Sequence, residues 1–110
     1  MITAFAALLL TTIQYITPSA RADIDAFIRF MWAADRCPGI VINDEETLER
    51  IGVLGRAQQW DEERVRDKIL VESRIAESLY KKNEEAFCSN VAKLYRSYDP
   101  EYLRQLGVID

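Results

Sequence analysis

A chain of 110 residues, 49% of them hydrophobic and 29% charged, has the size and composition of one globular domain rather than of a disordered segment. Eighteen acidic residues outnumber 14 basic ones, and no run of Lys or Arg is longer than a pair. The net charge of −4 therefore argues against binding to nucleic acid or to anionic lipid, and it favours a basic protein as a partner.

The first part of the sequence is an uncharged stretch. Residues 2–16 carry no charge, and the small-x-small triplet Ala20-Arg21-Ala22 follows them. This order is typical of a secretory signal and its cleavage site, so we expect residues 1–22 to be a signal peptide and residues 23–110 to form the mature domain. No basic residue precedes the apolar stretch, which leaves open a start further upstream. A buried first helix and an uncleaved membrane anchor remain the alternatives.

The mature part begins with a predicted helix. Apolar residues recur at three- and four-residue spacing between residues 24 and 36, which indicates an amphipathic helix that Pro38 and Gly39 end. The only β-branched run, Ile40-Val41-Ile42, is too short to predict more than a loop or an isolated strand.

A second helix is predicted to begin at Asn43-Asp44-Glu45-Glu46, where a capping residue precedes a glutamate by three positions, as in a capping box. Gly52 and Gly55 lie further along it, and each glycine costs about 1 kcal/mol relative to alanine in a helix interior. We therefore expect this helix to end near Arg56.

Two more helix starts are acidic. Trp60-Asp61-Glu62-Glu63 predicts a long third helix and Asn83-Glu84-Glu85 a fourth, because carboxylates are favourable at the positive end of a helix dipole. The buried stripe of the third helix is expected at Val65, Ile69, Ala76 and Leu79 or Tyr80. That of the fourth is expected at Phe87, Val91, Leu94 or Tyr95, and Tyr98.

The C-terminal segment has the signature of a short closing helix. Asp99 is a capping residue, Pro100 suits the first helical position, and Gly107 suits the position just past the end, so we expect about two turns. The sequence as a whole predicts an all-α fold, a small domain of four helices plus a short fifth.

The chain holds two cysteines, Cys37 and Cys88. In an oxidising compartment two cysteines allow one connectivity, so we predict a disulfide between them. Closing a loop of about 50 residues stabilises a fold by about 4 kcal/mol in the chain-entropy model. There is no Cys-x-x-Cys and no histidine, which argues against a redox or zinc site. In a chain that is not exported, the alternative is a pair of buried free thiols.

No pattern in the sequence predicts catalysis. The absence of histidine removes the commonest general base and every Ser-His or Cys-His pair. Ser78 and Lys81 match Ser-x-x-Lys, but enzymes that use this motif need far larger folds and companion motifs. The clusters Asp44-Glu45-Glu46 and Asp61-Glu62-Glu63 coincide with helix starts, where capping explains them. We expect no enzyme activity, metal or cofactor, with a small Asp/Glu-dependent cell-wall hydrolase as a residual alternative.

Three aromatic residues are candidates for an interface. Trp32, Trp60 and Tyr102 belong to the residue types that are over-represented in binding hot spots, and core packing is the alternative for each. Trp32 is rotated about the helix axis by about 100°, the rotation per residue, from the predicted apolar stripe of its helix. We therefore expect it at a rim or interface.

These observations together predict a periplasmic or secreted helical protein without catalytic activity. We expect it to act by binding another protein, as inhibitors and immunity-type proteins do, and not to stay inserted in a membrane after cleavage. The sequence does not identify the partner or the oligomeric state.

The layout of Cys37 and Cys88, about 50 residues apart in a small helical chain behind a signal peptide, resembles that of the HdeA family of acid-activated periplasmic chaperones. The resemblance covers the two cysteines and the general plan, and it transfers no functional residue. It implies an acid-stress chaperone as the alternative function. With 18 carboxylates and no histidine, protonation below about pH 4 would make the charge strongly positive and loosen the packing.

Overall fold

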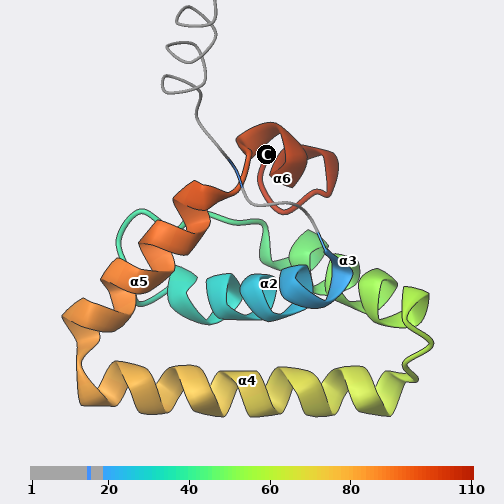
Figure 1. Cartoon of the computed structure of the whole chain (residues 1–110), viewed down its shortest axis with the longest axis horizontal. Helices are drawn as coiled ribbons and strands as arrows, with labels where there is room; N and C mark the ends of the chain where they lie inside the picture. Colours follow the sequence, from blue (N-terminus) through green and yellow to red (C-terminus); the bar gives the residue numbers. More distant parts are fainter. Residues whose placement is uncertain (1–14, 16–18) are drawn as a thin grey trace, which may run out of the picture.

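The computed structural model describes residue 15 and residues 19–110, and the all-helical prediction is confirmed for them (Figure 1). These residues form five helices and no strand. The helices are α2 (Ala20–Ala34), α3 (Asp44–Ala57), α4 (Glu62–Lys82), α5 (Glu84–Ser97) and α6 (Pro100–Gln105). The segment Ile40-Val41-Ile42 is a loop.

Each helix begins at a side chain that caps it. Asn43 and Asp61 accept hydrogen bonds from backbone N–H groups three residues further on, at the starts of α3 and α4. Asn83 caps α5 in the same manner, and Asp99 caps α6 by accepting a hydrogen bond from the N–H of Glu101, two residues further on. These four starts agree with the predicted ones, because an N-cap side chain satisfies backbone donors that have no partner inside the helix.

The first helix begins earlier than expected. We predicted a start at residue 24, whereas α2 starts at Ala20, where the Ser19 hydroxyl accepts a hydrogen bond from the N–H of Ala22 at 3.3 Å. The expected cleavage site after Ala22 therefore lies in the first turn of α2, and cleavage there would remove the Ser19 cap. Most of the predicted signal peptide lies outside the described residues.

The helix ends also differ slightly from the prediction. α2 ends at Ala34 rather than at residue 36, because Asp35 already closes the last turn. α3 ends one residue past the expected Arg56 and continues through both glycines. Gly55 lies so close to α4 that a Cβ atom there would be 2.6 Å from Val65 Cγ2, so this glycine allows α3 and α4 to meet.

Helix α2 is the centre of the domain. It contacts α3, α4 and α5, and α4 runs along one side of the molecule beneath it (Figure 1). More than half of the circumference of α2 is buried, through Ile24, Ala26, Phe27, Ile28, Phe30 and Ala33. The aromatic ring of Tyr98, at the end of α5, packs 5.8 Å from the rings of both Phe27 and Phe30. The core is thus aromatic where α2 and α5 cross.

Helix α4 is the least buried of the long helices, since only Ala76 is fully buried in it. Val65, Ile69 and Tyr80 of the predicted stripe are partly buried, but Leu79 faces solvent. None of the helices in the described part of the chain is both long and apolar enough to cross a membrane.

Candidate functional site

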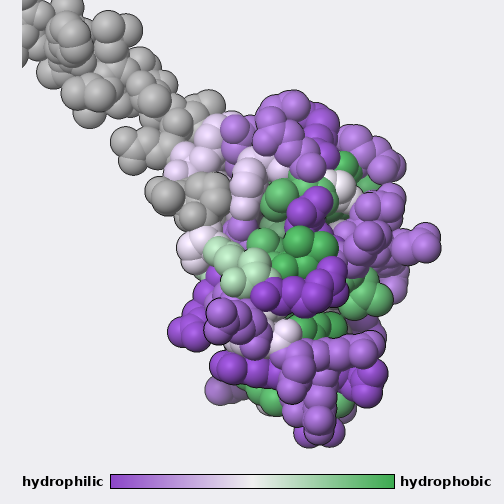
Figure 2. Space-filling view, turned by 90° about the vertical axis from the view of Figure 1, so that its right-hand side faces the viewer, coloured by the Kyte–Doolittle hydropathy of each residue, from purple (hydrophilic) through white to green (hydrophobic). Residues whose placement is uncertain are grey.

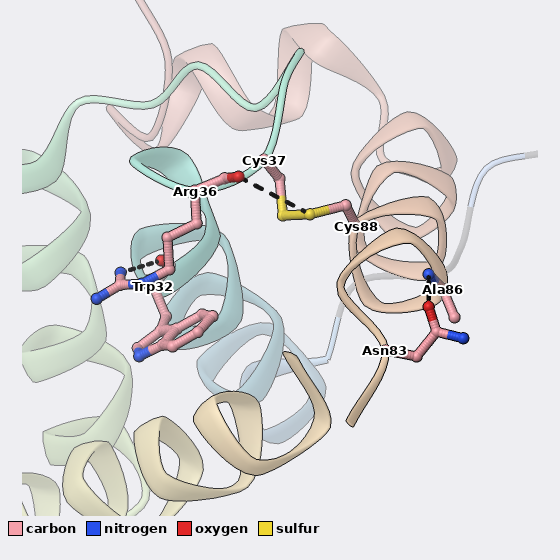
Figure 3. Close-up of a disulfide and its surroundings, with 6 residues drawn as sticks. All are labelled: Trp32, Arg36, Cys37, Asn83, Ala86 and Cys88. Atoms are coloured by element: carbon pink, nitrogen blue, oxygen red, sulfur yellow. Dashed lines mark hydrogen bonds between the residues drawn. A yellow bond between two sulfur atoms is a disulfide. The ribbon is translucent and has the colours of Figure 1, made fainter. Parts of the chain in front are cut away.

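The predicted disulfide is present between Cys37 and Cys88, whose Cα atoms are 5.3 Å apart (Figure 3). It joins the loop after α2 to the first part of α5, and Cys37 is buried. Disulfides persist in oxidising compartments, so this bond indicates a location outside the reducing cytoplasm.

Trp32 lies beside the disulfide and holds three helices together. Its ring meets the rings of Tyr80 in α4 and Phe87 in α5 edge-on, with centroids 5.4 Å away in both cases. The guanidinium of Arg36 covers its face at 4.0 Å and donates a hydrogen bond to the carbonyl oxygen of Trp32 (Figure 3). Trp32 is partly buried, and its contacts are those of a packing residue.

The other two candidate interface residues lie elsewhere. Trp60 is only 8% exposed and fills the turn between α3 and α4, with the guanidinium of Arg64 over its ring at 4.7 Å. Tyr102 is on α6 and stacks on Tyr98. The structure does not bring Trp32, Trp60 and Tyr102 together. Trp32 of α2 packs against Tyr80 near the end of α4, Trp60 lies in the turn before α4 begins, and Tyr102 is on α6.

A buried carboxylate at the start of α2 was missed by the sequence analysis. Asp23 is 1% exposed and accepts hydrogen bonds from the hydroxyl groups of Tyr98, at 2.7 Å, and Tyr102. Burial, together with the negative charge of Asp23, raises the pKa of both tyrosines above its ordinary value of 10. These bonds fasten the start of α2 to α6 and to the end of α5.

The candidate catalytic groups occupy ordinary structural positions. The clusters at Asp44-Glu45-Glu46 and Asp61-Glu62-Glu63 are exposed at helix starts. Lys81 forms an ion pair with Glu77 at 2.9 Å, and Ser78 is exposed. Within the described residues, no group of three or more Cys, Asp or Glu side chains could hold a metal ion.

Four charged side chains link α2 to α4. Lys68 Nζ lies 2.9 Å from Asp25 Oδ1 and 3.1 Å from Glu72 Oε1, and Arg29 lies 3.5 Å from the other oxygen of Glu72. The contact with Asp25, helped by Glu72, raises the pKa of Lys68. The network adds charged contacts to the apolar packing of Ala76 and Tyr80 of α4 against the core.

An open groove between α3 and α4 has an apolar floor and a volume of about 800 Å³. We call it the α3–α4 groove, and we call its uncharged lining residues its floor: Leu48, Gly52, Trp60, Val65 and Ile69. Leu48 is 49% exposed although it lies in the middle of α3. Figure 2 shows the end of the molecule where α3 and α4 join, and hydrophobic side chains are visible there between hydrophilic ones.

The rim of the α3–α4 groove is charged. Glu45 and Glu49 lie one turn apart on α3, at the end of the groove far from the turn, and neither forms an ion pair with another described residue. Glu62 and Arg66 pair with each other at 3.9 Å on α4, and Arg56 lies near the turn. The far end of the groove is therefore acidic.

A smaller hollow of about 420 Å³ lies on the other side of α4, against α5. Leu79 and Phe87 contribute to its apolar lining, and its charged groups are Arg29 and Lys82. Leu79 is 43% exposed, and Val71 and Ile75 of the same helix are also exposed beside it. Apolar side chains thus face solvent on both sides of α4.

No protein-family model, curated protein or solved structure matches this chain.

Proposed function

We propose that this chain is an exported helical protein that acts by binding another protein, and that the α3–α4 groove is its binding surface. The observation that supports this best is the combination of an apolar floor, two glutamates without an ion pair at the far end of the rim, and a half-exposed Leu48 in one groove. Concave apolar surfaces with a few polar groups at their edges are where proteins most often bind ligands and partners.

Export is supported by two independent features. The Cys37–Cys88 disulfide needs an oxidising compartment to form and persist. The uncharged stretch at residues 2–16, followed by Ala20-Arg21-Ala22, is typical of a cleaved signal. A small domain outside the cytoplasm benefits from a covalent link, because its core alone gives a narrow margin of stability.

The net charge of −4 suits the neutralisation of a basic partner, as in inhibitors and immunity-type proteins. Complementary charge raises the association rate, whereas the apolar floor of the groove supplies contact area that resists dissociation.

The test is capture of a partner from a periplasmic extract on the oxidised protein, followed by reconstitution of the complex from the purified, identified partner. We expect a complex of fixed stoichiometry that Leu48→Ser weakens by about tenfold or more, because Leu48 would be buried in the interface.

The matched control is Leu79→Ser, which makes the same change in the hollow on the other side of α4. It should leave the affinity unchanged. If Leu79→Ser abolishes binding of the partner and Leu48→Ser does not, the binding surface is the hollow against α5. A monomeric protein without any stoichiometric partner would overturn the proposal.

A second function, that of an acid-stress chaperone, is favoured by the charge network between α2 and α4. Strong acid, below the ordinary pKa range of carboxyl groups, removes negative charge from a protein, and Lys68 and Arg29 would then remain as cations between the helices without their partners. Because α4 buries only Ala76 fully, this loss would loosen α4 and expose apolar surface.

The chaperone proposal is tested by light scattering of an aggregating client protein at about pH 2.5. We expect the double variant Asp25→Asn/Glu72→Gln to suppress aggregation already at neutral pH, whereas Glu77→Gln, which breaks an exposed pair, should not. A protein that stays folded and inactive in acid would remove this function.

A further inference from the structure

Two glycines in α3 differ in what surrounds them. Gly55 is required by the fold, because a Cβ atom there would lie 2.6 Å from Val65. A Cβ atom at Gly52 would meet only the flexible end of Arg56, at 3.4 Å, among the described residues. Glycine weakens a helix interior relative to alanine, so the packing of this chain does not account for Gly52.

Gly52 lies in the floor of the α3–α4 groove, one turn from Leu48. A missing side chain at that position lets the backbone of another helix approach α3 closely, and Leu48 would then pack beside it. A half-exposed leucine thus lies next to a glycine whose Cβ position is approached only by the flexible end of Arg56, and a docked helix could pack there once that side chain moves aside.

The charge of the groove selects the partner. Glu45 and Glu49 are on the same side of α3, one turn apart, and neither forms an ion pair with another described residue. The cations in the groove lining are Arg56, near the turn, and Arg66, which pairs with Glu62. A basic side chain on the partner would pair with Glu45 and Glu49 at the rim, where water remains and the interaction mainly steers and orients the partner.

We infer that the α3–α4 groove binds an amphipathic α-helix of a partner protein, with its apolar face against Leu48 and Gly52 and with Lys or Arg at the edge that meets Glu45 and Glu49. This inference rests on the proposed function and specifies the partner. A helix satisfies its own backbone hydrogen bonds, so it can occupy an apolar groove, whereas a segment that binds as an added β-strand would need a sheet edge, which the described residues do not offer.

The test uses three stapled helical peptides of about 18 residues, long enough to span several turns of α3 and α4. Two of the peptides share one apolar face and carry either Lys or Glu along its edge, and in the third the apolar face is scrambled. Affinity is measured by fluorescence anisotropy on the oxidised protein, and the site is located by amide chemical shifts, for which Gly52 is a direct reporter.

We expect the Lys-edged peptide to bind at least about tenfold more tightly than the Glu-edged one, with the largest shifts at Leu48, Gly52 and Ile69. The double variant Glu45→Gln/Glu49→Gln should remove most of this preference. Its matched control, Glu84→Gln/Glu85→Gln, changes the net charge equally at exposed residues in the first turn of α5 and should leave it intact.

Gly52→Ala separates recognition from folding. The added methyl group should weaken the Lys-edged peptide by about tenfold or more, because it fills the place of closest approach, while the melting temperature stays equal or rises. A Gly52→Ala protein that binds as tightly as the parent would overturn the role of Gly52.

Equal affinity for the Lys-edged and Glu-edged peptides, or shifts outside the groove, would overturn the inference. A natural partner that depends on Leu48, combined with no binding of either peptide, would leave the proposed function standing and overturn only the helical, basic partner. If no natural partner depends on Leu48 and neither peptide binds, both the proposed function and this inference are wrong.

Discussion

Asp23 is the residue whose role in this domain is least visible in the sequence. Its carboxylate is buried at the start of α2, and its hydrogen-bond donors, Tyr98 and Tyr102, are 75 and 79 residues away in the chain. No local pattern links an acidic residue to tyrosines at that separation, whereas the capping residues could be recognised because their partners lie three residues away.

Removing one of these phenol groups should destabilise the fold. We expect Tyr98→Phe to lower the free energy of unfolding by about 1–3 kcal/mol, since it keeps the ring packing but leaves a buried carboxylate with one donor fewer. Chemical denaturation measures the change. Tyr95→Phe, which removes an exposed bond to the carbonyl oxygen of Val41, is the matched control and should cost less. An equal effect of the two substitutions would contradict the importance of Asp23.

The same tyrosines set an alkaline limit to stability. Because burial raises their pKa above 10, the unfolded chain loses these protons before the folded one, and stability falls as pH rises above about 10. Lys68, whose pKa is also raised, acts in the same direction. The double variant Tyr98→Phe/Tyr102→Phe should show a flatter loss of stability above pH 10; an unchanged slope would argue against the buried phenols.

The two glycines of α3 give opposite predictions. Gly52→Ala should raise the free energy of unfolding by about 1 kcal/mol, since alanine is the better helix former and its methyl group would meet only the flexible end of Arg56. Gly55→Ala should lower it by about 1–3 kcal/mol, because its methyl group collides with Val65. Thermal unfolding of the two variants measures both changes, and destabilisation by both would show that the side chain of Arg56 cannot move aside at Gly52.

At the scale of the elements, helix starts after Asn43, Asp61, Asn83 and Asp99 could be predicted because a cap is a local chemical event. The start of α2 was placed too late, because Ala20-Arg21-Ala22 was interpreted as a cleavage site. The same alanines are strong helix formers, and Ser19 is a good cap, so both interpretations use the same residues.

The face of α4 was harder to predict than its length. Periodicity indicated the stripe, but it could not choose between Leu79 and Tyr80, and the structure packs Tyr80 against Trp32 and Phe87 while Leu79 stays exposed. Nor could it show that Lys68 and Glu72 of α4 would form ion pairs with side chains of α2. The α3–α4 groove depends on how two helices diverge from a turn, which no single segment of the sequence encodes.

For the molecule as a whole, the Cys37–Cys88 disulfide connects loop and helix across 51 positions of the chain. Reduction, or the double variant Cys37→Ala/Cys88→Ala, should destabilise the domain by about 2–4 kcal/mol and lower its melting temperature by more than about 10 °C. Scanning calorimetry with and without reductant measures the shift. A melting temperature that reductant leaves unchanged would show that the aromatic cluster around Trp32 alone holds these elements together.

Both proposed functions require that the chain is exported and that Cys37 and Cys88 then form their disulfide. Mass spectrometry of the native product, with and without alkylation, tests both at once. We predict a protein that begins at Asp23 and takes up alkylating reagent at neither cysteine until it is reduced. A product that retains Met1 and is alkylated at both Cys37 and Cys88 without reduction would contradict the proposed location, and with it the preferred functions.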